Sequence, residues 1–382
     1  MTGSQHHQRA TISSIRIQGF RSLADLNLEE LSQAVVLIGA NGSGKSNLIR
    51  FFEMMSWMLR ARRLGEFVER QGGAGDQLFG GHSTTAVIEA EIGLRTGSGQ
   101  NDYKFALAHA HPDRFIFTRE GFRISREGSH EMAPWQWLGI AHREAEIIAA
   151  MEDNGAHDVN PQTARVIVSL LRSCAVYQFH DTSDTSSFKK NWDVDSTSSE
   201  LRSHGGNLAA VLYRLEQEDS RRYEWICDQI RRVLPIFDRF TISGRYGRVY
   251  LSWKARGQEK TYGAHLTSDG TLRFFALVTL LNLPSEMLPQ VLLLDEPELG
   301  LHPAAVSLVG GMIRSLSANR QIIVATQSPM LVDTFDIDEI IVFDLVNGRT
   351  ESRTLARHQY GQWLDEFTTG ELWQKNLLGG HP

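Results

Sequence analysis

Cysteine is scarce in this sequence: among 382 residues there are only Cys174 and Cys227, and neither lies in a CxxC or Cys/His metal-binding spacing. Two isolated thiols exclude a disulfide framework. The fourteen histidines form no HExxH or comparable cluster, and pairs such as His109 and His111 are typical of incidental placement. We therefore interpret the two cysteines as core thiols.

Long apolar runs are also missing. The longest, such as 274–283 and 291–294, are much shorter than the roughly 20 residues that a membrane-spanning helix needs. The first ten residues contain no apolar core that could direct secretion. We expect a cytoplasmic protein that does not contact a membrane.

An excess of basic residues is absent as well, because 39 lysines and arginines stand against 45 acidic residues, for a net charge of −6. This balance argues against a protein that coats nucleic acid, although it leaves room for a local basic face. Arginine pairs at 62–63, 221–222 and 231–232 have acidic neighbours, which favours solvated helix faces. Trp135 and Trp137 are more typical of a core than of a stacking platform.

The order of short patterns along the chain predicts an α/β protein. Strands are expected at 12–17, 26–28, 35–38, 85–94, 103–109, 114–118, 122–125, 174–179, 240–242, 249–253, 291–294, 322–325 and 340–343, and helices at 207–217, 221–234, 270–282 and 304–316. The four alternating segments between 85 and 125 are separated by turn residues, which indicates an antiparallel meander.

A glycine-rich loop follows the apolar strand at 35–38. The residues that match GxxxxGK[ST] are Gly39, Ala40, Asn41, Gly42, Ser43, Gly44, Lys45 and Ser46, with Asn47 following in the expected helix. Such glycines let successive backbone N–H groups point at phosphate oxygens, and the helix adds its positive N-terminal end. Lys45 would neutralise the β- and γ-phosphates of ATP, and the Ser46 hydroxyl would ligate Mg²⁺. The alternative, a turn with an exposed lysine, is disfavoured by the strand-loop-helix context.

Two acids, Asp295 and Glu296, follow the apolar run at 291–294. They stand at the carboxyl end of a strand, where α/β sheets bind ligands. Asp295 would hold Mg²⁺ through water, and Glu296 would act as the general base that polarises the attacking water. A strand that runs into an acidic helix cap would explain the pair in isolation, but its occurrence together with the phosphate-binding loop favours the catalytic interpretation.

Together, Asn41, the sequence DEPELGLHP at 295–303 and the sequence LTSDGTLR at 266–273 resemble the heads of ABC-type ATPases. The similarity is to RecF, the structural-maintenance-of-chromosomes (SMC) proteins, the overcoming-lysogenization-defect (OLD) ATPases and allied bacterial ATPases of the AAA family. The opening segment at 15–23 resembles their first hairpin. The resemblance covers roughly the first sixty residues and the stretch 262–345. It implies a P-loop NTPase of ABC-ATPase type, with a mixed sheet core, an antiparallel β lobe and a helical insertion.

The resemblance also assigns further residues. Ser268, Asp269 and Gly270 correspond to the ABC signature, in which a helix start faces the γ-phosphate held by the opposite protomer, and this implies a nucleotide-sandwiched homodimer. An ordinary capped helix would show the same residues, but their position upstream of the two acids favours the signature. Gln327 stands where the family commonly has a switch histidine. A glutamine can donate a hydrogen bond to phosphate but cannot carry the positive charge.

One glutamine of the family pattern stays ambiguous. Gln178, after the expected strand at 174–179, is a candidate for the Q-loop glutamine, and a surface glutamine is the alternative. We expect a disordered tail at 1–11, an N-terminal ATPase lobe at 12–133 with the phosphate loop and antiparallel strands, a mainly helical insertion at 134–235, and a C-terminal ATPase lobe at 236–382 with the signature, the Walker B acids and the switch.

These expectations lead to three functional hypotheses. The first is an ATPase whose closure as a dimer controls DNA processing or repair, or a separately encoded anti-phage effector. About forty residues follow the last expected strand, too few for a nuclease domain, so a nuclease partner would act in trans. The second is an ATP-binding sensor or scaffold that hydrolyses little and regulates a partner. Glu296 favours the first hypothesis, whereas Gln327 keeps the second open. A third hypothesis, RecF-like loading on DNA junctions without a toxic effector, is not separated from the first by the sequence.

Overall fold

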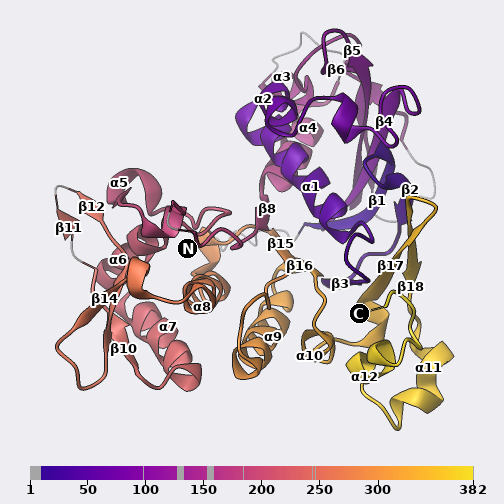
Figure 1. Ribbon diagram of the computed structural model, residues 1–382. Coiled ribbons are helices and arrows are strands. Elements are labelled where there is room, and N and C mark those ends of the chain that lie inside the picture. Colours follow the sequence, from indigo (N-terminus) through magenta and orange to yellow (C-terminus); the bar gives the residue numbers. More distant parts are fainter. Residues whose placement is uncertain are drawn as a thin grey trace, which may run out of the picture.

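The computed structural model describes residues 10–97, 99–126, 133–152, 159–183, 185–242, 244–245 and 247–381. Most of the tail expected at 1–11 lies outside these residues, and Thr11 already begins the first strand. Figure 1 shows an antiparallel lobe on one side of a central sheet and a mostly helical lobe on the other. None of the described helices combines the length and the apolar character needed to cross a membrane.

The central sheet carries the residues of greatest interest. Its strand order is β18-β17-β3-β16-β15-β8, in which β18 is antiparallel to β17 and the other neighbours are parallel. The strands are β3 (Ala34–Ile38), β8 (Cys174–Tyr177), β15 (Val291–Asp295), β16 (Gln321–Ala325), β17 (Ile340–Val346) and β18 (Arg349–Thr354). Every residue of β3, β15 and β16 is buried, as expected for unbroken apolar runs in a parallel sheet covered on both faces.

Alternate residues of these strands face two separate hydrophobic cores. Val36 and Leu292 contribute to one core, whereas their neighbours Val35 and Leu293 contribute to the other. This alternation follows from the two-residue period of a strand. The central sheet therefore separates the two lobes and belongs to both.

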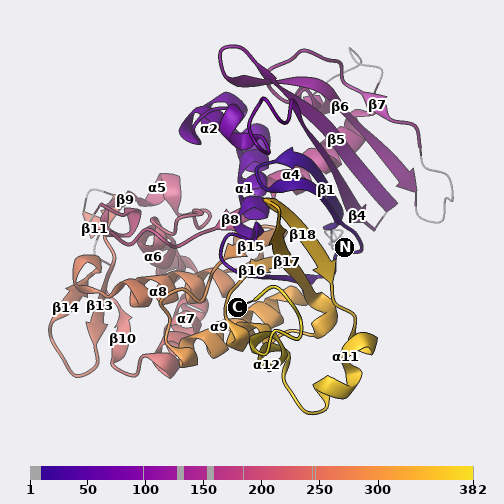
Figure 2. The ribbon, with the colours of Figure 1, turned by 45° about the vertical axis from the view of Figure 1, so that its right-hand side comes forward.

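The second core lies under an antiparallel sheet of order β2-β1-β4-β5-β6-β7, seen broadside in Figure 2. Its strands are β1 (Thr11–Phe20), β2 (Leu23–Leu28), β4 (Val87–Thr96), β5 (Gly99–Ala110), β6 (Arg114–Arg126) and β7 (Gln136–Trp137). The antiparallel meander is confirmed, but the two strands expected at 114–118 and 122–125 are one continuous strand, β6. The register shifts between Ala106 and Leu107, where β6 carries one extra residue. This bulge breaks the alternation and imitates a turn in the sequence.

Helices cover both faces of the central sheet. Those packed with the antiparallel sheet are α1 (Lys45–Ser56), α2 (Leu64–Arg70), α3 (Ile147–Glu152) and α4 (Pro161–Arg172). Those on the other side are α5 (Val194–Thr197), α6 (Leu208–Glu218), α7 (Ser220–Val233), α8 (Asp269–Leu281) and α9 (Pro303–Ser317), followed by α10 (Pro329–Val332), α11 (Arg357–Leu364) and α12 (Thr369–Gln374). The segment 134–235 therefore supplies helices to both lobes, and its strand β8 forms one edge of the central sheet.

Two small sheets complete the helical lobe. One consists of β10 (Phe237–Phe240), β13 (Ser252–Ala255) and β14 (Thr261–Gly263), and the other of β9 (Trp192–Asp193), β11 (Gly244–Arg245) and β12 (Arg248–Val249). The strand expected at 249–253 is wrong, because those residues are divided between β12 and β13. The strand expected at 240–242 overlaps β10 only at Phe240, the last residue of β10. Such short strands carry too few alternating positions to fix their bounds from sequence.

The last expected strand, at 340–343, is not the last strand of the structure. It continues as β17 into a hairpin with β18, and Figure 1 shows this hairpin beside β2. The sequence of β18, RTESRT, is polar, and only Thr350 in it is buried. A polar edge strand of this kind gives little periodic signal.

Candidate functional site

The glycine-rich loop connects the buried strand β3 to α1, as expected. Gly39 and Gly44 have φ values of 148° and 107°, a region that favours glycine. A Cβ atom at Gly39 would lie 2.1 Å from the Phe343 carbonyl oxygen, and one at Gly44 would lie 2.0 Å from Thr350 Oγ1. Glycine is therefore required at both positions by backbone conformation and by the close approach of β17 and β18.

A chain of hydroxyl and amide contacts supports the loop from outside. Thr350 Oγ1 donates to the Ser43 carbonyl oxygen at 2.9 Å and lies 2.7 Å from Ser22 Oγ. Asn47 Nδ2 donates to the same Ser22 Oγ at 2.7 Å. The side chain of Asn47, which we assigned to nucleotide binding from sequence, thus contacts the β1–β2 turn. Sequence reasoning missed Ser22 and Thr350, because each lies far along the chain from the loop that it supports.

Lys45 is held inside this loop. Its Nζ donates to the carbonyl oxygens of Gly39 at 2.5 Å and Ala40 at 3.0 Å, and it lies 3.5 Å from Ser43 Oγ. Burial lowers the pKa of Lys45, and the carboxylates of Glu296, Asp295 and Glu298 act in the opposite direction. The loop therefore places a cationic group among backbone dipoles, with acidic side chains near enough to act on it.

Asp295 ends β15 and is almost completely buried. Its Oδ1 is 3.4 Å from Ser46 Oγ and its Oδ2 accepts a 2.8 Å hydrogen bond from Gln178 Nε2. Burial raises the pKa of this carboxyl group, whereas nearby His180 lowers it. The side chain of Gln178 is half-buried and directed at the site, so the alternative of a surface glutamine is wrong. A hydroxyl and a carboxylate side by side are hard oxygen ligands of the kind that suits Mg²⁺.

Glu296 and Gln327 meet at the ends of neighbouring strands. Gln327 Nε2 donates a hydrogen bond to Glu296 Oε1. The Glu296 backbone N–H donates to the Ala325 carbonyl oxygen at 2.8 Å, and its φ of 45° is uncommon for a residue other than glycine. The parallel pairing of β15 and β16 thus brings together two residues that are 31 positions apart in the chain.

Glu298, for which no role was predicted from sequence, fixes the loop that carries Gln327. Its Oε1 accepts hydrogen bonds from Thr326 Oγ1 at 2.7 Å and from the Gln327 backbone N–H at 2.8 Å. Burial raises the pKa of Glu298, and these two hydrogen bonds act to lower it. The signal in the sequence was a third acid two residues after Glu296, in a segment that follows a buried strand.

We expect Glu298→Ala to lower the catalytic rate more than the affinity for ATP. The change leaves the Thr326 hydroxyl and the Gln327 N–H without their acceptor, and each unsatisfied buried donor costs about 1–3 kcal/mol. The loop at 326–328 should loosen, and the midpoint of thermal unfolding should fall. Glu298→Gln is the matched control, because its amide oxygen can accept both bonds. ATP turnover, nucleotide affinity and thermal unfolding would be measured for both variants, and equal losses in both would contradict the positioning role.

The segment assigned to the ABC signature begins α8. Ser268 is its N-cap, and its Oγ accepts from the Thr271 N–H at 3.3 Å. A Cβ atom at Gly270 would lie 2.3 Å from the Gly300 carbonyl oxygen. Within the described residues, Ser268, Asp269 and Gly270 make no hydrogen bond to the phosphate loop. A cavity of about 380 Å³ opens over Ser268 and Gly270 instead.

Arg273, the last residue of the segment that resembles the signature, joins α8 to the site through contacts that the sequence did not predict. Its Nε donates to the Phe179 carbonyl oxygen at 2.9 Å and its Nη2 to that of His180 at 3.0 Å. Its Nη1 donates to the Leu299 carbonyl oxygen at 3.3 Å. One guanidinium thereby ties the start of α8 to the segments that follow β8 and β15.

Known proteins resemble the chain in sequence and fold. A family model described as "AAA domain, putative AbiEii toxin, Type IV TA system" matches residues 34–132 and 173–333. "DNA replication and repair protein RecF" of Anaeromyxobacter dehalogenans (strain 2CP-1) is 30% identical over 161 residues, which is 37% of this chain and 43% of that protein. RecF of Anaeromyxobacter sp. (strain K) matches with the same identity and coverage. The chain thus spans less than half the length of the curated relatives that it matches.

Solved structures show the same fold at low sequence identity. An SMC head bound to the C-terminal winged-helix domain of ScpA has a TM-score of 0.59 at 15% identity, covering 92% of this chain and 99% of that one. The Pyrococcus furiosus SMC head, with an extended coiled coil and bound to the C-terminal domain of ScpA, has a TM-score of 0.54 at 14% identity, covering 94% and 99%. The expected mixed sheet core with an antiparallel lobe is confirmed. The family model covers most of the chain, including the carboxyl ends of β3, β15 and β16, and the chain accordingly belongs to the family of AAA domains described as putative AbiEii toxin, Type IV TA system, with the ABC-type P-loop NTPase fold of the SMC heads.

Proposed function

We propose that the chain binds ATP with Mg²⁺ and hydrolyses it at the carboxyl ends of β3, β15 and β16. The observation that carries this proposal is the 3.4 Å distance between Ser46 Oγ and Asp295 Oδ1. Beside this pair, Lys45 is held inside the glycine-rich loop by the Gly39 carbonyl oxygen. These are the groups that a P-loop ATPase needs at the β- and γ-phosphates and at the metal. Backbone N–H groups of Gly42, Gly44 and their neighbours would complete the phosphate cradle.

In this proposal each side chain has one task. Lys45 would leave its carbonyl partners for the phosphates, and Ser46 with Asp295 would hold Mg²⁺, Asp295 through water. Bound Mg²⁺ supplies positive charge that neutralises the phosphate oxygens. Glu296 would accept the proton of the attacking water as general base. Gln327, already bonded to Glu296, would orient that water or the γ-phosphate through its amide group.

We further propose that two copies close on two nucleotides. The support is the position of Ser268 and Gly270, which line an open cavity and, among the described residues, make no hydrogen bond to their own phosphate loop. A helix N-terminus of this kind favours a negative group. The γ-phosphate held by a second protomer would fill that place.

Ser268→Arg should weaken this closure by about 100-fold, equivalent to about 2.8 kcal/mol, because a bulky side chain would occupy the space of the second protomer. The affinity of the monomer for ATP should stay unchanged. Loss of the helix cap alone costs about 0.5–2 kcal/mol, so Ser268→Asn, which retains a capping group, is the control. Sedimentation with ATP and Mg²⁺ separates the two effects. A Ser268→Arg protein that dimerises as well as the wild type would exclude the sandwich.

The process served by this cycle is proposed from the relatives. The RecF proteins are named for DNA replication and repair, and the family description names a putative toxin of a toxin–antitoxin system. We propose that ATP-driven closure, in the cytoplasm, controls DNA processing or repair, or a separately encoded nuclease or other anti-phage effector. DNA binding measured over a salt series tests direct contact, because phosphate contacts make affinity fall steeply with salt. A weak response that does not vary with salt would count against it.

One observation favours the alternative function, an ATP-binding sensor or scaffold with little hydrolysis. The carboxylate proposed as the base already accepts a hydrogen bond from Gln327, and the glutamine carries no positive charge. Phosphate release with ATP and Mg²⁺, alone and with duplex or single-stranded DNA, distinguishes the two functions. Turnover that exceeds a Glu296→Gln blank supports hydrolysis. Tight ATP binding without turnover above that blank supports the sensor.

A further inference from the structure

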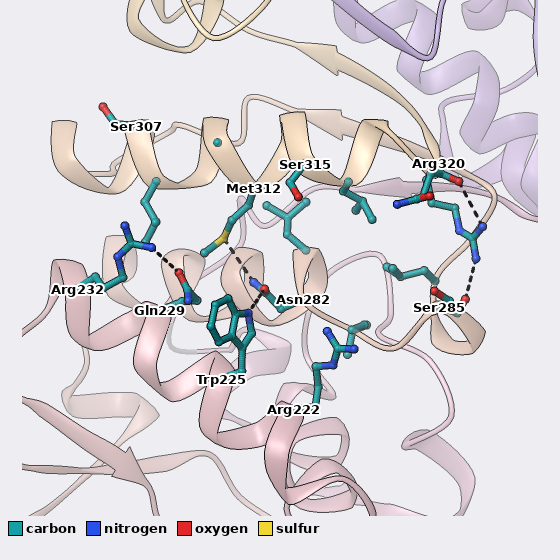
Figure 3. A pocket seen from close by; sticks show the side chains of 17 residues that line it. Arg222, Trp225, Gln229, Arg232, Asn282, Ser285, Ser307, Met312, Ser315 and Arg320 are labelled. Carbon is teal, nitrogen blue, oxygen red and sulfur yellow. Dashed lines mark hydrogen bonds between the residues drawn. The ribbon is translucent and has the colours of Figure 1, made fainter.

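A groove of about 680 Å³ lies between α7 and α9, away from the proposed ATP site. Its floor is the last turn of α8 with Leu283, Ser285 and Leu288, and its walls are one face of α7 and one face of α9 (Figure 3). The groove takes Leu281 and Asn282 from the C-terminal end of α8, whereas Ser268 caps the opposite end. At 1.5 Å per residue, the helix separates these two ends by roughly 20 Å.

The charged side chains among the described residues that line the groove are all positive. Arg222, Arg232 and Arg320 line it, and no acidic residue is among its described lining. Arg232 Nη1 donates to Gln229 Oε1 at 3.0 Å and Arg320 Nη2 donates to the Ser285 carbonyl oxygen at 3.0 Å, so both bond to neutral groups. The sequence had suggested solvated, acid-balanced helix faces for the arginine pairs.

The two members of one pair lie on the same helix, α7, and differ in their partners. Arg231 forms ion pairs with Asp228 at 2.5 Å and Glu224 at 3.5 Å. Arg232, one residue later, turns to the groove. In a chain of net charge −6, a concave surface with three arginines and no described acid is a local excess of positive charge.

The groove also exposes apolar surface. Trp225 is 52% exposed, and its indole N–H donates to Asn282 Oδ1 at 2.9 Å, which fixes the ring at the groove wall. Leu308, Met312 and Leu316 add apolar side chains from α9 at the helical spacing of four residues. Tryptophan, methionine and arginine, all present here, are residue types that are enriched at protein interfaces.

Small residues leave room for a partner backbone. Ser307, Gly311 and Ser315 follow one another at four-residue intervals along the groove face of α9. A Cβ atom added at Gly311 would meet no atom within 4 Å. The groove face of α9 from Ser307 to the end of the helix at Ser317 is about 15 Å long, close to three turns of a helix.

We propose that this groove docks an amphipathic helix of a partner protein, with an apolar face toward Trp225 and Met312 and acidic residues toward the arginines. Figure 3 shows Arg232 near the Ser307 end and Arg222 and Arg320 toward the other end, so acids at both ends of one helix would find partners. Helix-in-groove recognition uses apolar anchors at three- and four-residue spacing, as α9 presents here. Single-stranded nucleic acid fits less well, because it needs successive aromatic platforms, and Trp225 is the sole aromatic residue of the described lining.

The test is a selection of 16-residue peptides, displayed on phage, against the full chain without nucleotide. We expect the enriched peptides to share apolar residues at i, i+3, i+4 and i+7 and to carry Asp or Glu on the flanks. Their affinity, measured by fluorescence anisotropy, should fall at least tenfold for Gly311→Leu, which fills the open space, and for the double variant Arg222→Glu/Arg232→Glu. Replacing the peptide acids with lysine should have the same effect.

Matched variants separate the groove from general effects. Gly361→Leu is the control for Gly311→Leu, because a Cβ atom at Gly361 in α11 also meets nothing within 4 Å. Arg221→Glu, on α7 but outside the groove, is the control for charge. Thermal unfolding of each variant would verify its folding.

Three results would overturn the proposal. The first is that no peptide is enriched. The second is that the enriched peptides bind the groove variants as tightly as they bind the wild type. The third is that the groove variants lose binding of a single-stranded 12-nucleotide probe but keep binding of the peptides. The last result would make the groove a nucleic-acid site. Because the groove needs no nucleotide, these outcomes are independent of whether the chain hydrolyses ATP.

Discussion

Glu296→Gln should lower the rate of ATP hydrolysis by about 10²–10⁴-fold, the range that a positioned general base contributes. The change is nearly isosteric. The new amide oxygen can accept the same hydrogen bond from Gln327 that the carboxylate accepts now. The fold, the Ser46–Asp295 pair and the phosphate loop should therefore be preserved, while the group that takes the proton from water is lost.

The same variant should accumulate the closed dimer. If closure follows ATP binding and opening follows hydrolysis, a protein that binds but cannot hydrolyse stays closed. Phosphate release and sedimentation with ATP and Mg²⁺ would be measured together, and Glu366→Gln, an exposed acid on the C-terminal segment, serves as the control. Hydrolysis by Glu296→Gln at the wild-type rate would show that Glu296 is not the general base. If both the wild type and Glu296→Gln stayed monomeric with ATP, the proposed nucleotide-sandwiched dimer would be excluded.

The sequence was informative wherever a feature was continuous in the chain. The run Val35–Ile38 predicted a buried parallel strand, and the loop and helix after it needed no distant residue to be recognised. The acids after Leu294 were found in the same way. In both places an unbroken apolar run and the polar residues that follow it are enough to locate the carboxyl end of a strand.

Features that depend on distant contacts could not be predicted. Thr350 supports the phosphate loop from a polar edge strand, and Glu298 positions Gln327 through hydrogen bonds that exist only when β15 and β16 lie side by side. Arg273 was read as part of a motif, although its contacts are backbone carbonyls on two other segments. None of these pairings leaves a periodic signal in a single sequence.

Lys45→Ala should weaken ATP binding by on the order of 100-fold. An ammonium group that bonds two phosphates forms charge-assisted hydrogen bonds worth about 1.5–3 kcal/mol each, and about 2.8 kcal/mol already corresponds to 100-fold in affinity. The structure adds a second reason. Lys45 lies near enough to Glu296, Asp295 and Glu298 for their charges to act on its pKa. Without the ammonium group, the phosphates would approach these acids with one positive charge fewer between them.

Thermal unfolding with and without ATP and Mg²⁺ measures this effect. At a nucleotide concentration 100 times the dissociation constant of the wild type, binding stabilises the folded state by about 2.7 kcal/mol. A variant with 100-fold weaker binding would gain only about 0.4 kcal/mol at the same concentration, so most of the shift in the unfolding midpoint should vanish. Lys104→Ala is the matched control, because Lys104 pairs with Glu91 at 3.0 Å in the antiparallel sheet and has no part in the site. If Lys45→Ala kept the full ATP-dependent shift, the glycine-rich loop would have to be a structural turn, and the nucleotide would have to bind elsewhere.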